Sequence, residues 1–298
     1  MLPVVEERSN ANGQPMRSKT VVITGGNTGI GKETAVELAR LGARVVITSR
    51  DPRRGATALD EIRARSGRDD AVVMDLDLAS LDSVRDFAQQ LLARYERLDV
   101  LVENAGLVVH KRRETADGFE MTFGINHLGH FLLTALVRDR LVASAPARVL
   151  VVASDAHRSA RSGLDFDDLQ STKRYRASVV YGKSKLANIL FARELARRLE
   201  GTGVTSNSLH PGVVATRFGR DGDLGWLGRI GMPLVRPFVL NASQGAQTSV
   251  YLASSPDVEA ITGLYWYKCT PAQSTRAAQD DAAARRLWDE SVRLVGLA

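Results

Sequence analysis

Tyr181 and Lys185 are the two residues of this sequence whose types and spacing most directly suggest chemistry. They stand at the start of an apolar run with helical spacing, so we expect them one turn apart on one face of a helix. A free tyrosine has a pKa of about 10 and exchanges protons poorly at neutral pH, whereas a nearby ammonium group favours the phenolate. The pair is therefore a candidate for acid/base catalysis. The spacing alone also fits a surface lysine that follows a helical tyrosine.

The elements around this pair alternate between strand and helix. Short apolar segments predict strands at residues 19–24, 44–48, 71–75, 100–102, 149–154 and 204–209. Helical spacing predicts helices at residues 32–41, around 59–62, and at 80–95, 119–136 and 181–199. This alternation predicts an α/β fold with one Rossmann-type, doubly wound parallel sheet covered by helices on both faces. We expect a single domain over residues 19–298 after a flexible tail at residues 1–18.

A glycine cluster lies between the first predicted strand and the first predicted helix. Gly25 would let the chain turn sharply off the strand, Gly29 would let the backbone approach a phosphate, and Gly31 would let the helix pack on the sheet. The helix N-terminus then offers free N–H groups to an anion. The cluster favours a dinucleotide-binding turn, and the alternative is a tight structural turn without a ligand.

Composition excludes several classes of protein. The chain has 298 residues, of which 44% are hydrophobic and 25% charged, as is usual for globular proteins. Its net charge is +6, but it has no compact basic run interleaved with aromatics, so nucleic acid is not an expected partner. Cys269 is the single cysteine, which excludes an intrachain disulfide and a cysteine-based metal site. Without a signal-peptide core or a run of about 18 apolar residues, we expect no membrane span and a cytoplasmic location.

Several motifs occur along the chain in one order. They are Thr24-Gly25-(three residues)-Gly29-Ile30-Gly31, Asn104-Ala105-Gly106, Asn126, Ser154, Tyr181-(three residues)-Lys185 and Pro211-Gly212. This order resembles that of the short-chain dehydrogenases/reductases over about residues 19–270. Residues 27–35, 126–131 and 181–188 further resemble the branch that holds retinol dehydrogenases and light-dependent protochlorophyllide reductases.

The resemblance implies a catalytic role for four residues. Tyr181 donates a proton to a carbonyl oxygen, or takes one from an alcohol, as hydride moves to or from nicotinamide. Lys185 lowers the pKa of Tyr181 and hydrogen-bonds the nicotinamide ribose. Ser154 holds the reacting oxygen, and Asn126 positions a water in a proton relay with Lys185. Taken singly, Ser154 could instead cap the end of a strand, and Asn126 could make a local helix hydrogen bond.

The cofactor assignment depends on the end of the second strand. Ser49 and Arg50 stand where a basic group would receive an adenosine 2′-phosphate, which favours NADP(H), while Asp51 would favour NAD(H) if it pointed inward. The resemblance places the following residues at the cofactor: Gly25, Asn27, Thr28, Gly29, Ile30, Gly31, Ser49, Arg50, Asp77, Leu78, Asn104, Ala105, Gly106, Tyr181, Lys185, Pro211, Gly212 and Thr216.

A metal site is not expected. His127 and His130 are three positions apart, but no acidic or cysteine partner with ligand spacing is near them in the sequence. We therefore interpret both histidines as packing or surface residues.

Two features depart from the family at large. Glu103 stands where the family more often has a first asparagine before Asn104, and a carboxylate in a central strand must find a donor or stay protonated. The interval from Ser154 to Tyr181 is also long, as in the retinol branch. Its segment at residues 164–170 could wall the substrate pocket or form a mobile surface loop.

Substrate specificity in this fold is expected after the sixth strand. Residues 217–240 are rich in apolar side chains but interrupted by glycine and proline, so we expect a lid at about residues 215–241 that closes over a lipophilic substrate. A hydrophobic helix packed on its own domain is the alternative. Arg229 and Arg236 could let this segment rest on an anionic membrane surface.

The sequence thus predicts an NADP(H)-dependent oxidoreductase that interconverts a lipophilic aldehyde or ketone and its alcohol. The alternatives are an NAD-dependent alcohol or steroid dehydrogenase, an enzyme that reduces a carbon–carbon double bond, and a non-catalytic dinucleotide-binding redox sensor. The resemblance also implies a homo-oligomer that pairs through the two long helices bearing Asn126 and Tyr181.

Overall fold

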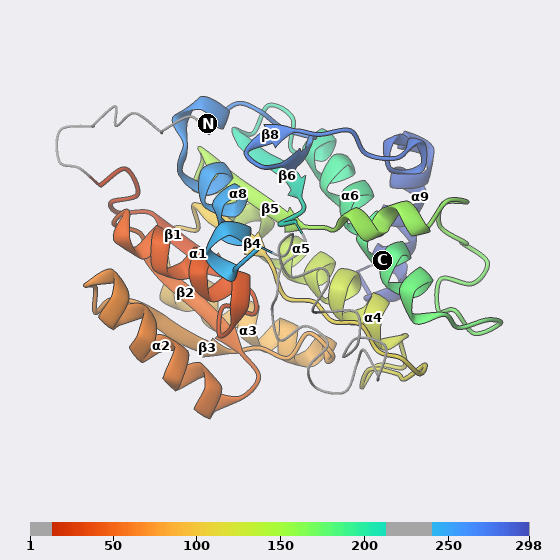
Figure 1. Ribbon diagram of the computed structural model, residues 1–298, viewed down its shortest axis with the longest axis horizontal. Helices are drawn as coiled ribbons and strands as arrows, with labels where there is room; N and C mark the ends of the chain where they lie inside the picture. The colour runs from red at the N-terminus through yellow and green to blue at the C-terminus, as the bar shows by residue number, and fades with distance from the viewer. Residues whose placement is uncertain (1–13, 213–239, 298) are drawn as a thin grey trace.

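The computed structural model describes residues 14–212 and 240–297. Within them the central feature is one eight-stranded sheet in the order β3-β2-β1-β4-β5-β6-β7-β8 (Figure 1). The strands are β1 Thr20–Ile23, β2 Arg44–Ser49, β3 Val72–Asp75, β4 Val100–Glu103, β5 Ala147–Val152, β6 Val204–Leu209, β7 Tyr265–Tyr267 and β8 Thr270–Pro271. Neighbouring strands from β3 to β7 run parallel, and β8 pairs antiparallel with β7. The predicted doubly wound α/β fold is confirmed, with an antiparallel edge that was not predicted.

The central strands are buried on both faces, which explains their continuous apolar sequence. In β1, Val22 belongs to one hydrophobic cluster, while Val21 and Ile23 belong to another. Because successive side chains of a strand point to opposite faces, these clusters are the two layers of core above and below the sheet. The strand order reverses between β1 and β4, and ligands of such sheets bind beyond the carboxyl ends of the strands at this point.

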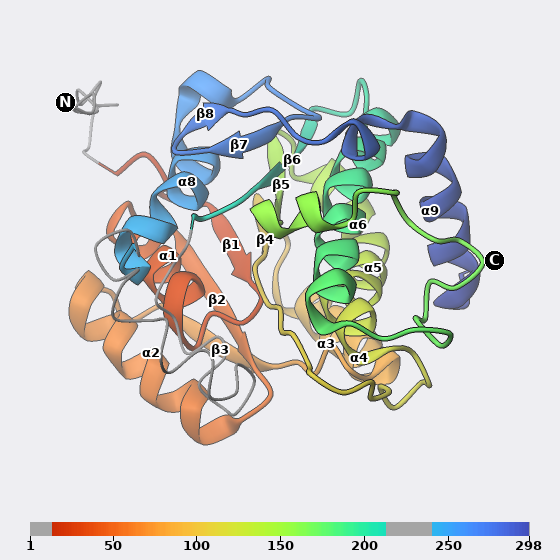
Figure 2. The same ribbon diagram turned by 45° about the vertical axis from the view of Figure 1, so that its right-hand side comes forward.

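Helices form a layer on each face, as Figure 2 shows. One layer contains α1 Gly29–Arg40, α2 Pro52–Ser66 and α8 Ala242–Ser254. The other contains α3 Leu81–Arg94, α5 Gly129–Ala143 and α6 Ala177–Arg198, and α9 Asp281–Leu294 packs on the outer side of α6. Short 3₁₀ turns are found at Asp155–Ser159, Pro256–Val258 and Arg276–Gln279.

The predicted helix at residues 119–136 is not uniform. It consists of α4 Met121–Phe123, a π-helical turn at Gly124–Leu128, and then α5. The π-helical turn contains Asn126, and such turns are frequent at functional sites because they re-aim side chains and free backbone groups. The helix predicted at residues 181–199 begins earlier, at Ala177, so Tyr181 lies in its second turn.

Only parts of the predicted tail and lid fall within the described residues. Met16 is buried, and its N–H donates to the carbonyl of Leu41 at 2.9 Å, so the chain is already packed on α1 by this point. The predicted lid lies outside the described residues except for its last two. Of these, Asn241 forms the capping box of α8 with Gln244. Among the described helices, none is long and apolar enough to cross a membrane.

Candidate active site

The turn after β1 has the backbone that its glycines predict. Gly25 and Gly29 have φ angles of +63° and +55°, a region that side-chain-bearing residues rarely adopt. A Cβ atom at Gly31 would lie 2.4 Å from Nδ2 of Asn104 and 2.6 Å from the carbonyl oxygen of Gly25. The close packing at Gly31 is therefore against the turn and the loop after β4, and not against a strand as predicted.

Thr24 joins this turn to the loop after β4. Its hydroxyl oxygen accepts the backbone N–H groups of Asn104 at 2.9 Å and Ala105 at 3.0 Å. In return, Nδ2 of Asn104 donates to the carbonyls of Thr24 at 2.9 Å and Gly25 at 3.3 Å. The two loops at the switch point of the sheet are thus held together, and they form one side of the predicted cofactor crevice.

At the end of β2, the side chains of Ser49, Arg50 and Asp51 make different contacts. The carboxylate of Asp51 caps α2 by accepting the N–H groups of Arg53 at 3.0 Å and Arg54 at 3.1 Å. The hydroxyl of Ser49 accepts from Nδ2 of Asn27 at 3.2 Å. Arg50 is exposed, and its guanidinium makes no ion pair or hydrogen bond with any other described residue.

Other predicted cofactor residues follow the carboxyl ends of β3 and β6. Asp77 accepts the N–H of Ala79 at 2.9 Å, and Leu78 packs so closely that a Cβ at Gly129 would lie 2.8 Å from its carbonyl oxygen. Gly212 has a φ of +87°, and its N–H donates to Nδ1 of His210 at 3.1 Å. Thr216 lies outside the described residues.

Helix α6 brings Tyr181 and Lys185 to the end of β5. The Lys185 ammonium lies 5.7 Å from the centre of the Tyr181 ring and donates to the carbonyl of Val152 at 2.9 Å. Ser154 follows β5, and its hydroxyl favours the ionised form of the Tyr181 phenol and so lowers the Tyr181 pKa, which places the two side chains next to each other. The Ser154 hydroxyl also accepts the N–H of Ala156 at 3.2 Å, so this residue both caps a short turn and reaches the tyrosine.

Asn126 completes the group from the π-helical turn. Its side chain is fully buried, and it pairs with the backbone of Leu107 through two hydrogen bonds, at 2.8 and 2.9 Å. Its Nδ2 also donates to the hydroxyl of Ser184 at 3.0 Å. A Cβ at Gly106 would lie 3.3 Å from both Oδ1 of Asn126 and Nζ of Lys185. The four predicted catalytic residues therefore meet around the loop after β4, and Asn126 bonds across the site instead of within its own helix.

Burial is the main cause of the pKa shifts in the site. Tyr181 is partly exposed, yet desolvation raises the pKa of its phenol to about 12, and the Ser154 hydrogen bond opposes this only in part. Lys185 is not among the causes of this shift, and the lowering of the Tyr181 pKa by Lys185 that the resemblance implies stays a prediction. Lys185 directs its own ammonium to Val152, and burial lowers the pKa of Lys185 to about 8.

Glu103 is the second buried ionisable group beside Lys185. Desolvation raises the pKa of Glu103 to about 8, and the Lys185 charge opposes that rise. The hydroxyl of Thr134 donates to Oε1, while Oε2 is buried and has no hydrogen-bond partner among the described residues. The carboxyl group thus meets both expectations: it has found a donor, and near neutral pH it keeps its proton.

Proteins of known family are similar to this chain in sequence. The family model for short chain dehydrogenases matches residues 19–165. Retinol dehydrogenase 14 of Homo sapiens is 47% identical over 315 residues, which cover 98% of this chain and 91% of the relative. The chain belongs to the short-chain dehydrogenase/reductase family.

Solved structures agree with this assignment. An uncharacterised protein from Mycobacterium paratuberculosis is similar with a TM-score of 0.76 and 34% identity, and 96% of each chain is covered. An NADP active-site complex of RhlG from Pseudomonas aeruginosa is similar with a TM-score of 0.67 and 26% identity, over 85% of this chain and 96% of that one. This dehydrogenase lies in the retinol dehydrogenase-like branch and is an NAD(P)-dependent oxidoreductase acting on CH–OH and C=O groups.

His157 and His130 make hydrogen bonds that link the segments around the dehydrogenase site, and the sequence did not predict these roles. Nδ1 of His157 donates to the carbonyl of Ser154 at 2.8 Å, and its Nε2 accepts the N–H of Thr275 at 3.3 Å. His130 lies between Thr24 and Asn126, with Nε2 2.9 Å from the threonine hydroxyl and Nδ1 3.2 Å from the Asn126 carbonyl. A carbonyl can only accept, so Nδ1 carries the proton in both rings.

His127 has the packing role that was predicted. Its ring lies among those of Phe123, Phe131 and Phe191, and its Nε2 is 2.9 Å from the hydroxyl of Ser291. Burial lowers the pKa of His127 to about 3 and that of His130 to about 4, so both are neutral at physiological pH. Residues 14–212 and 240–297 contain no cluster of three or more histidine, cysteine or acidic side chains that could hold a metal ion.

Proposed function

We propose that this dehydrogenase uses NADP(H) to interconvert a lipophilic aldehyde or ketone and its alcohol, with Tyr181 as the general acid and base. The observation that carries the proposal is the meeting of the Ser154 and Tyr181 hydroxyl groups beside the buried Lys185. Two hydroxyl groups joined in this way can both hold one substrate oxygen. When bound, the nicotinamide supplies or accepts the hydride.

Each side chain then has one task. The Ser154 hydroxyl orients the substrate oxygen, and the Tyr181 hydroxyl gives that oxygen a proton during reduction or takes one during oxidation. Lys185, with a pKa lowered to about 8, can exchange protons at nearly neutral pH and can return one to the tyrosine. Asn126 lies beside Lys185, since a Cβ at Gly106 would be 3.3 Å from both Oδ1 of Asn126 and Nζ of Lys185, and it would position a water that relays that proton.

The described residues fit a dinucleotide whose adenosine carries a 2′-phosphate. The positive φ angles of Gly25 and Gly29 open the turn after β1 to a pyrophosphate. The exposed, unpaired Arg50 supplies a cation at the end of β2, and Asp51, the residue that would favour NAD(H), is engaged as the cap of α2. The similar RhlG structure is a complex with NADP.

A lipophilic substrate is supported by the relatives' name and by the segment before α6. Leu164, Phe166 and Leu169 pack against the core cluster, and the guanidinium of Arg286 lies 4.4 Å from the centre of the Phe166 ring. This anchoring favours a wall of the substrate pocket over a free surface loop. The lid proposed at residues 215–241 falls almost wholly outside the described residues.

The test is a titration of the purified protein with NADPH and NADH, followed by nicotinamide fluorescence, and then turnover with a panel of lipophilic aldehydes and ketones. We expect tighter binding of NADPH and its consumption with at least one panel member. Tyr181→Phe should bind NADPH as the wild type does while turnover is lost. Retained turnover in Tyr181→Phe would disprove the mechanism, and binding without consumption across a broad panel would favour a redox sensor.

The other expectations also stay proposals. We propose a single domain in the cytoplasm, without a nucleic-acid partner, that forms a homo-oligomer and makes at most peripheral contact with membranes. Sedimentation at micromolar concentration tests the oligomer. Flotation with anionic liposomes tests the membrane contact.

A further inference from the structure

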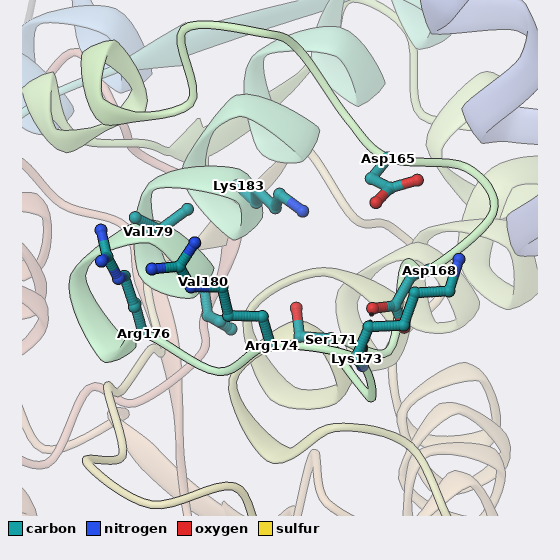
Figure 3. A pocket seen from close by; sticks show the side chains of 9 residues that line it. All are labelled: Asp165, Asp168, Ser171, Lys173, Arg174, Arg176, Val179, Val180 and Lys183. Atoms are coloured by element: carbon teal, nitrogen blue, oxygen red, sulfur yellow. Dashed lines mark hydrogen bonds between the residues drawn. The ribbon is translucent and has the colours of Figure 1, made fainter.

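We propose that a cavity between the segment at residues 165–176 and the first turns of α6 is a binding site for a phosphate group. Figure 3 shows this cavity, whose volume is about 240 Å³. It is lined by Lys183 and does not include Tyr181, Ser154 or Lys185. The inference is independent of the reaction proposed above.

Four cationic side chains line the cavity. They belong to Lys173, Arg174, Arg176 and Lys183. Among the described residues, none of the four side chains has an ion-pair or hydrogen-bond partner. A concave surface that gathers unpaired cations attracts anions, since the low-dielectric walls focus the field.

The two carboxylates of the cavity offset only part of this positive charge. Asp168 is used to build the loop, because one oxygen accepts the N–H and the hydroxyl of Thr172 at 2.7 and 2.8 Å and the other accepts the N–H of Lys173 at 3.0 Å. Asp165 accepts the N–H of Asp167 at 3.2 Å. With four cations and two carboxylates, the lining keeps a net positive charge that matches a phosphate dianion.

Ser171 adds a hydroxyl donor to the cavity. The residue is 3% exposed and lines the cavity, and its hydroxyl makes no hydrogen bond with another described residue, although its oxygen is not itself fully buried. A ligand oxygen in the cavity can therefore accept the Ser171 proton. In Figure 3 the Ser171 hydroxyl and the Lys183 ammonium are directed toward the same space.

The start of α6 and the size of the cavity favour phosphate over larger anions. Arg176, the N-cap residue of this 22-residue helix, makes no side-chain cap, and the first turn has no acidic residue. The positive end of the helix dipole is thus not neutralised by its own chain and adds to the attraction for an anion. At about 240 Å³, the cavity is smaller than the sites that enclose drug-sized ligands. A phosphate with a small organic substituent fits it.

Isothermal titration with inorganic phosphate and with glycerol 3-phosphate tests the site in protein saturated with its nicotinamide cofactor. Saturation keeps the probes out of the cofactor crevice. We expect saturable binding with one site per chain, and an affinity about tenfold or more weaker in Arg174→Gln, Lys183→Gln and Ser171→Ala. Arg161→Gln is the matched control, because Arg161 is an exposed cation four residues before this segment and does not line the cavity. Its affinity should stay at the wild-type value.

Three results would overturn the site. They are no saturable binding by the wild type, equal binding by the double variant Arg174→Gln/Lys183→Gln, and acetate binding as tight as phosphate binding. Vesicles of phosphatidylcholine with and without phosphatidic acid separate the two sources of a phosphate group. Sedimentation with phosphatidic acid vesicles that the double variant loses would assign a lipid headgroup. Phosphate binding without vesicle binding would assign a soluble ligand.

Discussion

Lys183 and Lys185 are two residues apart on α6, but they face different surroundings. Lys185 is 3% exposed and donates to the carbonyl of Val152, whereas Lys183 lines an open cavity with no ion-pair partner among the described residues. On the buried face, desolvation moves the pKa values of Lys185 and Glu103 to about 8. Burial therefore creates groups suited to proton transfer, and exposure leaves groups suited to recognising an anion.

We expect the largest effect when the buried positive charge of Lys185 is removed. Lys185→Met should lower kcat by about 10²- to 10⁴-fold, because the tyrosine loses the neighbouring group that returns its proton. Stopped-flow or steady-state reduction of the best aldehyde measures the effect, and thermal unfolding confirms that the variant folds. Arg161→Gln serves as the surface-charge control. A Lys185→Met enzyme that keeps more than a tenth of wild-type kcat would show that the buried lysine is not needed for proton transfer.

The exposed cation at the end of β2 offers the second test. Arg50→Asp should weaken NADPH binding about 10- to 100-fold, because a charge-assisted contact to the 2′-phosphate becomes a repulsion. NADH, which lacks that phosphate, should bind as before or more tightly. Fluorescence titration gives both dissociation constants, and Arg53→Gln, an exposed cation on the first turn of α2, is the control. Equal weakening of both cofactors would place the 2′-phosphate elsewhere.

The third test addresses how the buried face is held. His157→Ala should lower the free energy of unfolding by about 2–3 kcal/mol, because the Ser154 carbonyl loses a donor and the Thr275 N–H loses its acceptor. His157→Asn can still donate to Ser154 and should lose less. Urea unfolding of the three proteins gives the values. Equal losses in both variants would assign the effect to packing alone.

The last test is a change in how the free energy of unfolding varies with pH. Between pH 4.5 and 8, folded protein keeps the Glu103 proton that the unfolded chain has released, so the free energy of unfolding should fall as pH rises. The fall is at most about 1.4 kcal/mol per pH unit for one group. Lys185 is protonated in both states over this range and adds nothing until pH exceeds about 8, above which its lowered pKa makes stability rise instead.

Glu103→Gln should remove that slope. Its free energy of unfolding, measured at several values between pH 5 and 7.5, should fall less with pH than that of the wild type. Parallel curves for the two proteins would mean that Glu103 is ionised in the folded state.

Local patterns were enough to predict the parallel strands β1 to β6, whereas β7 and β8 were not predicted. That Tyr181 and Lys185 carry the chemistry stays a prediction. The apolar strands, the turn at Gly25 and the helical spacing of Tyr181 and Lys185 each depend on residues near in sequence. The rise in the Tyr181 pKa could not be predicted this way, because desolvation depends on what the fold places around the ring. The π-helical turn at Asn126 likewise follows from a side chain that bonds to Leu107 and Ser184, which lie 19 and 58 residues away.

Histidine roles show the same limit. His157 could have been suspected from its position three residues after Ser154, but its second partner, Thr275, is 118 residues further along the chain. The sequence of His127 and His130 also gives no sign of which histidine packs among phenylalanines and which links Thr24 to Asn126.

Helix α9 has a consequence for self-association. Its Trp288 ring contacts Phe131 of α5 at 4.9 Å and Phe191 of α6 at 5.9 Å between ring centres, and Arg198 lies over the same ring at 4.4 Å. These aromatic side chains of α5 and α6 are therefore covered by α9 of the same chain. A second copy approaching from this side would meet the exposed charges of α9, such as Arg285 and Asp289. A dimer formed there would dissociate as ionic strength increases, since salt screens contacts between exposed charges.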